Sequence, residues 1–385
     1  RRDLHLKGSG RTPLSRGGDG KATLGPMLRE FVIAEAMHAL GVPTTRALAV
    51  AVTGEEIARE GMEPGAVLTR VASSHLRVGT FEYSARAGDN DAFKKLVDYS
   101  IDRHYRQVLD AEQPYLAFFE AVLDKQAGLI AQWMLFGFIH GVMNTDNVTI
   151  SGEGIDYGPC AFMDRYDPAT VFSSIDHAGR YAYGNQPHIT TWNLTRLAET
   201  LVSLVNEDFD VAAEALTSAL NGFDDRYRSH WVAGMRAKLG IVVAKDSDGD
   251  FFDELLSLMQ TSQLDYTSTF RSLAALLRDQ AAEPVFGAEN LIAAHWVTRW
   301  RSRLAAQGTE LSQAADLMDA ANPVYIPRNH LVDQALNAAT KGDMVPFQEL
   351  LRVVTDPFVE RDGLERFAKP APDGFENGFK TFCGT

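Results

Sequence analysis

The sequence changes character near residue 90, and this change restricts the folds that the chain can adopt. Up to that point, alternating apolar and polar residues predict short strands around one amphipathic helix at residues 27–40. These expected strands lie at residues 4–8, 45–53 and 65–72. A strand-rich beginning before a helical remainder predicts an α+β fold, with the joint at residues 72–92.

Helical periodicity dominates the rest of the chain. It covers residues 92–111, 115–142, 193–220, 223–238, 250–260, 266–280, 288–306 and 331–353. The exception is 142–175, where short β-like runs alternate with Gly, Asp and Pro. Nearer the start, residues 8–25 are expected to form a long loop, and Gly54 is expected to end a strand.

Composition excludes several classes of function. The formal net charge is −14 and the pI is near 5.2, which argues against a nucleic-acid partner because such proteins need a basic face. The sequence has no run of about 18 apolar residues, so we expect no membrane partner. Two cysteines, Cys160 and Cys383, are too few for a disulfide framework or a Cys-based zinc site. A cytoplasmic location is the simplest expectation.

Two segments resemble known ligand-binding loops but lack residues that those loops require. The run GGDGKA at residues 17–22 resembles a phosphate loop, but it has Ser15 and Ala22 where that motif needs Gly and Ser or Thr. Residues 246–250 resemble a calcium loop, but Ser257 stands where the bidentate Glu belongs. An acidic helix start is the better interpretation of the second run.

The segment that carries chemistry is HGVMNTDN at residues 140–147, followed by IDYG at 155–158. Protein kinases carry His-Arg-Asp-Leu-x-x-x-Asn and then Asp-Phe-Gly, and Asn147 falls at the kinase spacing from His140. Mg²⁺ prefers oxygen ligands, and a carboxylate, an amide and nucleotide phosphates can supply them. We therefore expect Asn147 and Asp156 to hold a divalent metal.

One kinase residue is missing from this segment. Val142 occupies the position of the kinase catalytic Asp and cannot accept a proton. Asp146, next to Asn147, could do so from another direction, although a loop Asp can also simply cap a turn.

Candidate partners for a nucleotide occur upstream. Lys7 ends the first expected strand, and Glu30 in the following helix could form with it the ion pair that a kinase needs. Arg70 and Arg77 follow a later strand and offer planar groups suited to phosphate. Each also has a structural interpretation, as a solvated surface residue or as part of an internal ion pair.

With these residues the chain resembles the selenoprotein O (SelO, YdiU-type) pseudokinase family over almost its whole length. The resemblance rests on LKGSGRTP at 6–13, REF at 29–31, GVPTTRAL at 41–48, the two runs at 140–147 and 155–158, GRYAY at 179–183, NP at 322–323 and RN at 328–329.

The resemblance implies a protein-kinase-like two-lobe fold. A small strand-rich N-lobe would occupy residues 1–90, and a mainly helical C-lobe with a C-terminal extension would occupy 91–385. The family's glycine-rich strand pair precedes the lysine matched by Lys7, so the N-lobe is expected to be truncated at its start.

The implied activity is protein adenylyl transfer. Members of the family bind ATP in a flipped orientation and transfer AMP to Ser, Thr or Tyr hydroxyls of proteins, using Mg²⁺ or Mn²⁺ and releasing pyrophosphate. Uridylyl transfer from UTP with Mn²⁺ has also been attributed to them. An atypical protein kinase and an inactive nucleotide-binding scaffold remain the alternatives for this chain.

The resemblance also implies a role for each matching residue. Asp146 would accept the proton, and Asn147 and Asp156 would hold the metal. The residues that would bind or align the nucleotide are Lys7, Asp19, Gly20, Glu30, Arg70, Arg77 and Asp156.

The C-terminal tail matches a redox-active segment in some members. There a selenocysteine or cysteine is thought to bond to the activation-loop region, where Thr170 stands in this chain. We expect Cys160 to be a small core residue and Cys383 to be a free, redox-responsive thiol.

Overall fold

The structure is a computed structural model that describes residues 1–13, 15, 17–59, 61–278, 285–286 and 290–382. Its strands are β1 (Asp3–Lys7), β2 (Ala22–Thr23), β3 (Arg46–Ala58), β4 (Met62–Ala72), β5 (Phe138–Ile139) and β6 (Ala161–Phe162).

The helices make up most of the remainder. They are α1 (Leu24–Ala39), α2 (Val78–Arg86), α3 (Asn90–His104), α4 (Pro114–Leu135), α5 (Gln186–Val205), α6 (Phe209–Asn221), α7 (Phe223–Lys238), α8 (Asp248–Thr261), α9 (Tyr266–Arg278), α10 (Leu291–Ala305), α11 (Leu311–Ala321), α12 (Asn329–Ala339), α13 (Val345–Val354) and α14 (Glu365–Ala368). Single 3₁₀ turns lie at Arg106–Asp110, Thr145–Asn147 and Tyr183–Asn185.

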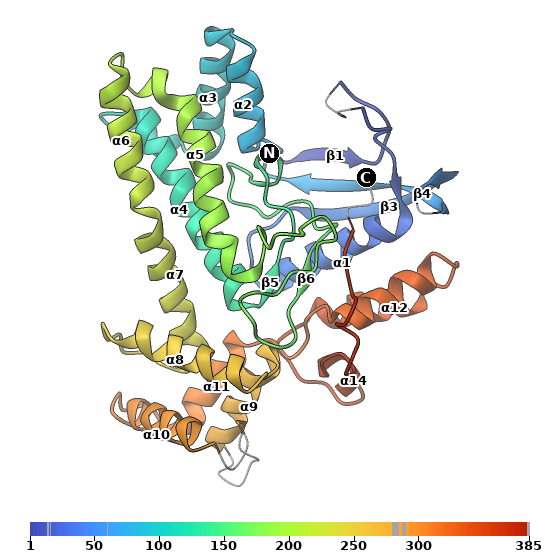
Figure 1. Cartoon of the computed structure of the whole chain (residues 1–385), viewed down its shortest axis with the longest axis vertical. Coiled ribbons are helices and arrows are strands. Elements are labelled where there is room, and N and C mark those ends of the chain that lie inside the picture. Colours follow the sequence, from blue (N-terminus) through green and yellow to red (C-terminus); the bar gives the residue numbers. More distant parts are fainter. Residues whose placement is uncertain (14, 16, 60, 279–284, 287–289, 383–385) are drawn as a thin grey trace.

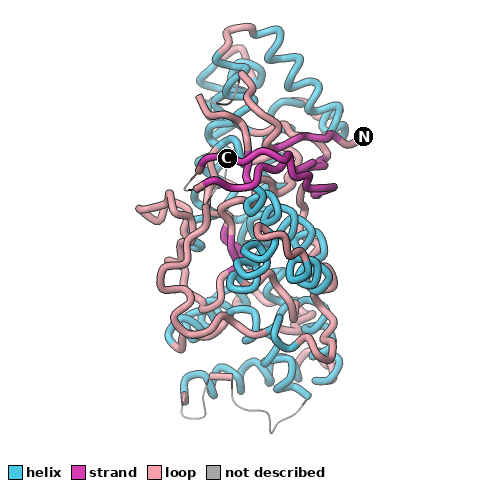
Figure 2. The backbone as a smooth tube through the Cα atoms, turned by 90° about the vertical axis from the view of Figure 1, so that its right-hand side faces the viewer, coloured by secondary structure: helices cyan, strands magenta, loops and turns pink. Residues whose placement is uncertain are grey.

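The predicted α+β class is confirmed: a strand-rich N-terminal region precedes a mostly helical remainder (Figure 1). β4 is the central strand of an antiparallel sheet, with β1 and β2 along one edge and β3 along the other. Figure 2 shows these strands as one layer, with helices on either side of it along the molecule. α1 packs against β3 and β4 and, on its other side, against α12 and α13.

The register of the sheet decides which side chains share a face. His5 of β1 lies opposite Arg70 of β4, and Lys7 lies opposite Leu68. Because side chains alternate along a strand, His5 and Lys7 point to the same face as Arg70, while Leu4 and Leu6 are exposed on the other.

Several predicted boundaries were wrong. α1 begins at Leu24, and β2 lies inside the expected 8–25 loop. β3 does not end at Gly54 but continues to Ala58, because a bulge between Val52 and Glu56 absorbs the glycine at a φ of 79°.

The helical predictions erred where segments are short or interrupted. The periodicity at 115–142 stops at Leu135, because Gly137 has a φ of 69° and the chain then enters β5. The run at 193–220 begins earlier, at Gln186, and divides into α5 and α6. The sequence analysis missed α2 and α11, which have only two and three buried residues.

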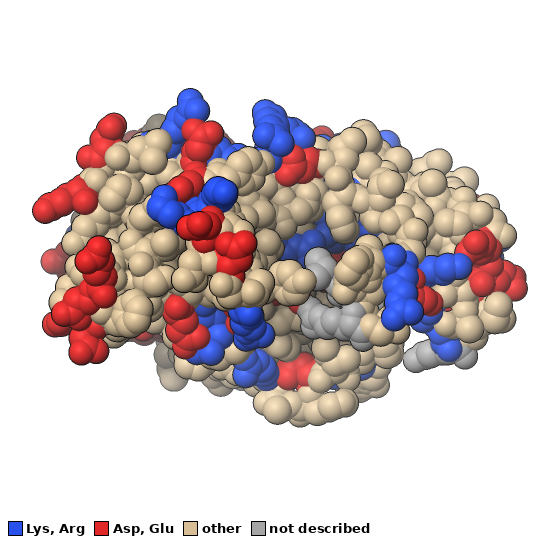
Figure 3. Space-filling model, turned by 90° about the horizontal axis from the view of Figure 1, so that it is seen from above, with Lys and Arg blue, Asp and Glu red and all other residues tan. Residues whose placement is uncertain are grey.

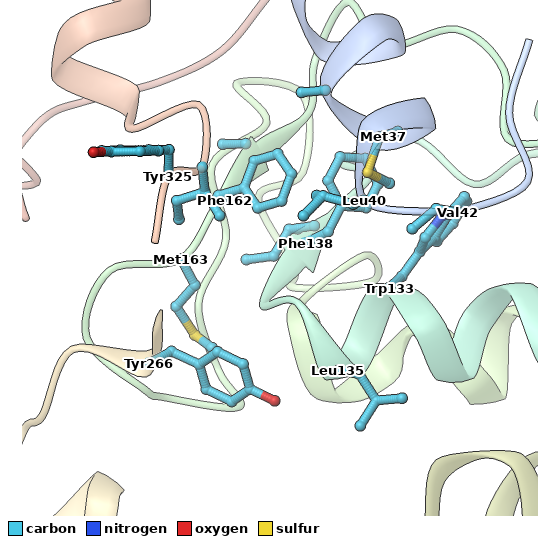
Figure 4. Close-up of a cluster of buried hydrophobic side chains, with 14 of the residues drawn as sticks. Met37, Leu40, Val42, Trp133, Leu135, Phe138, Phe162, Met163, Tyr266 and Tyr325 are labelled. Atoms are coloured by element: carbon cyan, nitrogen blue, oxygen red, sulfur yellow. The ribbon is translucent and has the colours of Figure 1, made fainter. Parts of the chain in front are cut away.

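The largest apolar cluster joins distant parts of the chain (Figure 4). Met37 and Leu40 of the α1 region meet Trp133 of α4, Phe138 of β5 and Phe162 of β6. The β5–β6 pair therefore lies beneath α1 in this cluster.

Among the residues that the structure describes, no helix combines the length and the apolar composition needed to cross a bilayer.

Lys238, at the end of α7, is a fully enclosed cation. Its Nζ lies 4.0 Å from the centre of the Phe270 ring and 5.5 Å from that of Tyr266. In the described ranges no carboxylate pairs with it, and burial lowers the pKa of Lys238 to about 7. The aromatic rings are its main compensation for lost hydration.

Replacing Lys238 by Met is expected to raise the free energy of unfolding at pH 7 by about 1–4 kcal/mol, as when buried charges are replaced by apolar groups. The folded pKa of about 7 lies below the unfolded value. The unfolded chain therefore binds more protons between pH 7 and 10, and wild-type stability rises across that window. Urea unfolding at several pH values should show a smaller rise in Lys238→Met. The exposed substitution Lys341→Met is the control. If the free energies of unfolding of wild type, Lys238→Met and Lys341→Met rose equally with pH, the lowered pKa of Lys238 would be contradicted.

Candidate active site

Glu30 of α1 is the centre of a buried ion network. Its carboxylate accepts a hydrogen bond from Lys7 at 2.9 Å and another from Nε of Arg70 at 2.7 Å. Both cations also reach Oδ1 of Asp156, Lys7 by a short contact and Arg70 at 3.3 Å. The expected Lys7–Glu30 ion pair is therefore present, and Arg70 and Asp156 complete it.

The charges in this network stabilise one another. Burial opposes ionisation of Glu30 and Asp156, but Lys7 and Arg70 outweigh it and hold the pKa of both carboxyl groups below their usual values. The pKa of Arg70, which burial alone would lower, is raised by Glu30 and Asp156. Glu30, Asp156 and Arg70 are thus charged at neutral pH.

Asp156 is held in an unusual backbone conformation. Its φ is 68°, in the left-handed region that Asp and Asn tolerate better than other non-glycine residues. On one side Thr45 and Gly154 are joined by a backbone hydrogen bond of 2.9 Å. On the other, the Tyr157 hydroxyl lies 2.5 Å from Oγ1 of Thr44. These contacts aim the Asp156 carboxylate at Lys7 and Arg70.

The loop at 140–147 is fixed by its own side chains and by α5. Asn147 donates from its amide nitrogen to the carbonyl of Val142 at 2.9 Å, and Asn193 of α5 donates to the carbonyl of Met143 at 2.9 Å. Nε2 of the buried His140 lies 2.8 Å from the carbonyl oxygen of Ile155, which ties this loop to the Asp156 segment.

Asp146 lies against the first turn of α2. A Cβ at Gly79 would overlap the Asp146 carboxylate, so a larger residue there would displace this side chain. Arg77, the N-cap of α2, donates from Nη1 to the main-chain carbonyl of Asp146 at 3.0 Å. A carboxylate near a helix N-terminus is stabilised in its charged form.

Arg77 is only partly matched by negative charge. Burial and the neighbouring Arg70 lower the pKa of Arg77 to about 10, with Asp156 and Glu30 acting in the opposite direction. Viewed from above, the surface has basic side chains at the base of a depression near the middle of this face (Figure 3).

Two predicted nucleotide-binding residues lie outside this network. Asp19 forms an exposed pair with Arg59 at 3.0 Å, beside the β3–β4 hairpin. Gly20 accepts a backbone hydrogen bond of 3.1 Å from Gly10, and its φ of 68° and close approach to Gly10 both require glycine. The structure thus gives these two residues a role in shaping the 8–21 loop, and their contact with nucleotide stays a prediction.

The donor set near Asp156 fits a metal carried by a nucleotide. Within the described part of the chain, Oδ2 of Asp156 and Oδ1 of Asn147 accept no hydrogen bond, since Asp156 accepts through Oδ1 and Asn147 donates through its amide nitrogen. No group of three or more His, Cys, Asp or Glu among those residues forms a metal cage. Mg²⁺ bound with substrate phosphates needs only one or two protein oxygens.

The predicted core role of Cys160 is confirmed. The residue is fully buried, its Sγ donates to the carbonyl of Tyr157 at 3.1 Å, and burial raises the pKa of the thiol. Cys383 lies outside the described residues. Just before it, Thr381 pairs with Ser173 and donates to the carbonyl of Pro159, so this part of the tail lies beside the segment that follows Asp156.

The sequence analysis missed supporting residues at the site. Gly79 contacts Asp146 directly, whereas Thr44 and Asn193 contact residues of the loops that carry the predicted residues. His5 and His75, next to Arg70 and Arg77, were also missed. Only the position of His5 two residues before Lys7 on one strand face could have indicated its place.

Comparison with known proteins gives one consistent result. The family described as "Protein adenylyltransferase SelO" matches residues 1–355. "Protein nucleotidyltransferase YdiU" of Cereibacter sphaeroides is 57% identical over 387 residues, covering 100% of this chain and 79% of the relative. The protein of that name from Mycolicibacterium paratuberculosis is 56% identical, and the match covers 100% of this chain and 78% of the relative. The one from Rhodococcus jostii is 54% identical, and the match covers 100% of this chain and 75% of the relative. The chain therefore belongs to the SelO family of protein adenylyltransferases.

Proposed function

We propose that this chain is a protein adenylyltransferase that transfers AMP from ATP to Ser, Thr or Tyr hydroxyls of other proteins and releases pyrophosphate. Its family supports an enzyme of the nucleotidyltransferase class. The observation that carries the choice of AMP over phosphate is Val142. The position of the kinase catalytic Asp has no carboxylate, and its carbonyl is taken by Asn147.

The proposed scaffold is kinase-like, with an N-lobe at residues 1–90 and a C-lobe at 91–385. The Lys7–Glu30 pair on β1 and α1 is the arrangement that a kinase uses to position phosphates. Lys7, Arg70 and Arg77 would face the phosphates of a flipped ATP, with Asp19 and Gly20 along its other side.

In the proposed reaction Asp146 accepts the proton of the attacking hydroxyl as its oxygen bonds to the α-phosphorus. The bond from the α-phosphorus to the bridging oxygen breaks, and pyrophosphate leaves with that electron pair. Arg77 and Lys7 neutralise the charge that develops on the leaving group. Mg²⁺ or Mn²⁺ held by Asn147 and Asp156 would neutralise phosphate charge. Positioning supplies much of the rate.

Intact-mass measurement tests this assignment. The chain is incubated with ATP and Mg²⁺ or Mn²⁺, alone and with candidate protein substrates, and parallel samples receive UTP. Added adenylyl groups support the proposal, whereas added phosphoryl groups would establish an atypical kinase. Uridylyl groups formed in preference from UTP would change the nucleotide assignment. Nucleotide binding without any transfer would favour the inactive scaffold.

Asp146→Asn is expected to slow AMP transfer about 10²-fold, the usual contribution of a positioned general base. The Kd for nucleotide should stay near the wild-type value, because the proposed role of Asp146 is proton transfer and the residue lies against the first turn of α2. Transfer rates and nucleotide titrations would be compared with Asp362→Asn, an exposed control in the loop after α13. Equal rates in the two variants would remove Asp146 from the mechanism.

A further inference from the structure

Two histidine rings face each other beside the ion network. His5 of β1 and His75, in the loop between β4 and α2, have ring centres 5.1 Å apart and an interplanar angle of 39°. Nδ1 of His5 and Nε2 of His75 are both buried, and within the described residues neither has a hydrogen-bond partner. A buried polar atom without a partner costs free energy, so such atoms often mark a ligand position.

The pair is placed there by the strand register and by the turn that follows β4. His5 lies opposite Arg70 and on the same strand face as Lys7. His75 precedes Arg77 by two residues, and the segment between them is fixed by hydrogen bonds from Ile150 to Leu76 and from Val78 to Val148. Both rings therefore border the side of the network that carries the two arginines.

The charges that face the rings are predominantly positive on the network side. Arg70, Arg77 and Lys7 lie there, against the carboxylates of Glu30 and Asp156. On the outer side Arg103 of α3 pairs with Asp3 at 2.8 Å, and Nε2 of His104 lies 2.8 Å from Oγ of Ser74. The groups whose charges act on the two rings are Asp3, Lys7, Glu30, Arg70 and Arg77, and a charge on His5 also lowers the pKa of His75. The pair therefore favours a single shared proton.

The rings are neutral in the structure as it stands. Burial, reinforced by Arg70, lowers the pKa of both His5 and His75 to about 4. An anion bound at the arginines would remove that effect and add negative charge of its own. Phosphate oxygens accept hydrogen bonds, so they would also satisfy the buried ring nitrogens when these carry protons.

We propose that His5 and His75 are phosphate ligands of the nucleotide site, and that the pair takes up a proton from solvent when a triphosphate binds beside Arg77. The inference rests on the proposed nucleotide-binding function and extends it. Binding of ATP by this chain is then coupled to pH. Neither ring is required for the chemistry of transfer itself.

The experiment measures the protons taken up on binding. Calorimetric titration of wild type with MgATP at pH 6.5, in two buffers of different ionisation enthalpy, gives the proton number directly. If binding gives the one proton shared by the pair an ordinary histidine pKa of about 6.5, uptake at pH 6.5 is about half a proton per nucleotide. By linkage, binding then tightens about threefold per pH unit on acidification near pH 6.5.

Comparison with variants separates the protons taken up by the two histidines from the protons bound by ATP itself. His5→Gln, His75→Gln and the double variant keep a polar side chain, and His295→Gln on the exposed face of α10 is the matched control. We expect the double variant to lose the half proton and the threefold pH dependence, and His295→Gln to keep both. Thermal unfolding checks that each variant is folded. If the double variant is not folded, proton uptake is compared in the single variants instead.

The failures are distinguishable. MgATP binding with equal proton uptake in wild type and in the folded histidine variants would overturn the inference and leave the proposed function intact. A wild-type chain that binds no MgATP would overturn the nucleotide site and the inference together.

Discussion

Asp156→Asn is expected to abolish nucleotidyl transfer while the chain stays folded. The substitution removes the only carboxylate proposed to hold the metal, and metal stabilisation of phosphate charge is worth several kcal/mol in such reactions. Since each 1.36 kcal/mol changes a rate tenfold, we expect a loss of at least about 10³-fold. Mass spectrometry of AMP incorporation, with nucleotide binding measured separately, gives the comparison.

Asparagine is the informative replacement at this position. The φ of Asp156 is 68°, where alanine would add about 1–2 kcal/mol of backbone strain and asparagine is tolerated. Asn also keeps the size of the side chain beside Lys7 and Arg70. Loss of activity in Asp156→Asn can therefore be assigned to the missing charge. Wild-type transfer in this variant, with normal rates in Asp362→Asn, would exclude Asp156 from the metal site.

The same variant tests the electrostatics of the network. Lys7 and Arg70 hold the pKa of Asp156 well below its unfolded value of about 3.9 despite burial. The carboxylate therefore contributes stability above that pH, and this contribution is lost as pH falls below it. Acid unfolding of Asp156→Asn should show a shallower decline than wild type below about pH 4. If the stability of wild type and of Asp156→Asn declined equally below about pH 4, the stabilisation of the Asp156 carboxylate by Lys7 and Arg70 would be contradicted.

Arg328→Met is expected to lower the free energy of unfolding by about 3–5 kcal/mol, the usual cost of breaking a buried ion pair from one side. The Arg328 guanidinium is completely buried. It pairs with Asp164 and, at 2.6 and 2.9 Å, with Asp265, and it donates to the Ala368 carbonyl at 2.9 Å. Removing it leaves two carboxylates without their cation.

A surface pair provides the matched control. Arg299 meets Glu254 at 2.7 Å, but both side chains are exposed, so Arg299→Met should cost no more than about 1 kcal/mol. Urea unfolding of both variants measures the difference. If Arg328→Met unfolds at the same urea concentration as Arg299→Met, Arg328 does not hold the β6, α9 and C-terminal segments together.

Much of the site could be predicted from chain order and spacing. The Lys7–Glu30 pair follows from a strand-end lysine and a helix glutamate, and both the pair and its burial are present. Asn147 and Asp156 were selected by spacing alone; the structure ties their two loops together through His140, and their metal-binding role stays a prediction. Arg328 was noted only as part of a similar stretch, because sequence cannot show that two distant aspartates meet it.

Local pattern by itself determined the α+β class, the strands β1 and β4, most of the helices and the motif residues, because alternation and helical periodicity record which side of each element is buried. Only the tertiary structure decided that Gly79 of the unpredicted α2 meets Asp146, that His5 meets His75, and that Asp19 lies apart from the Glu30 network. Such contacts depend on strand register and on how separate elements pack together. A periodicity read within one element carries no information about its distant neighbours.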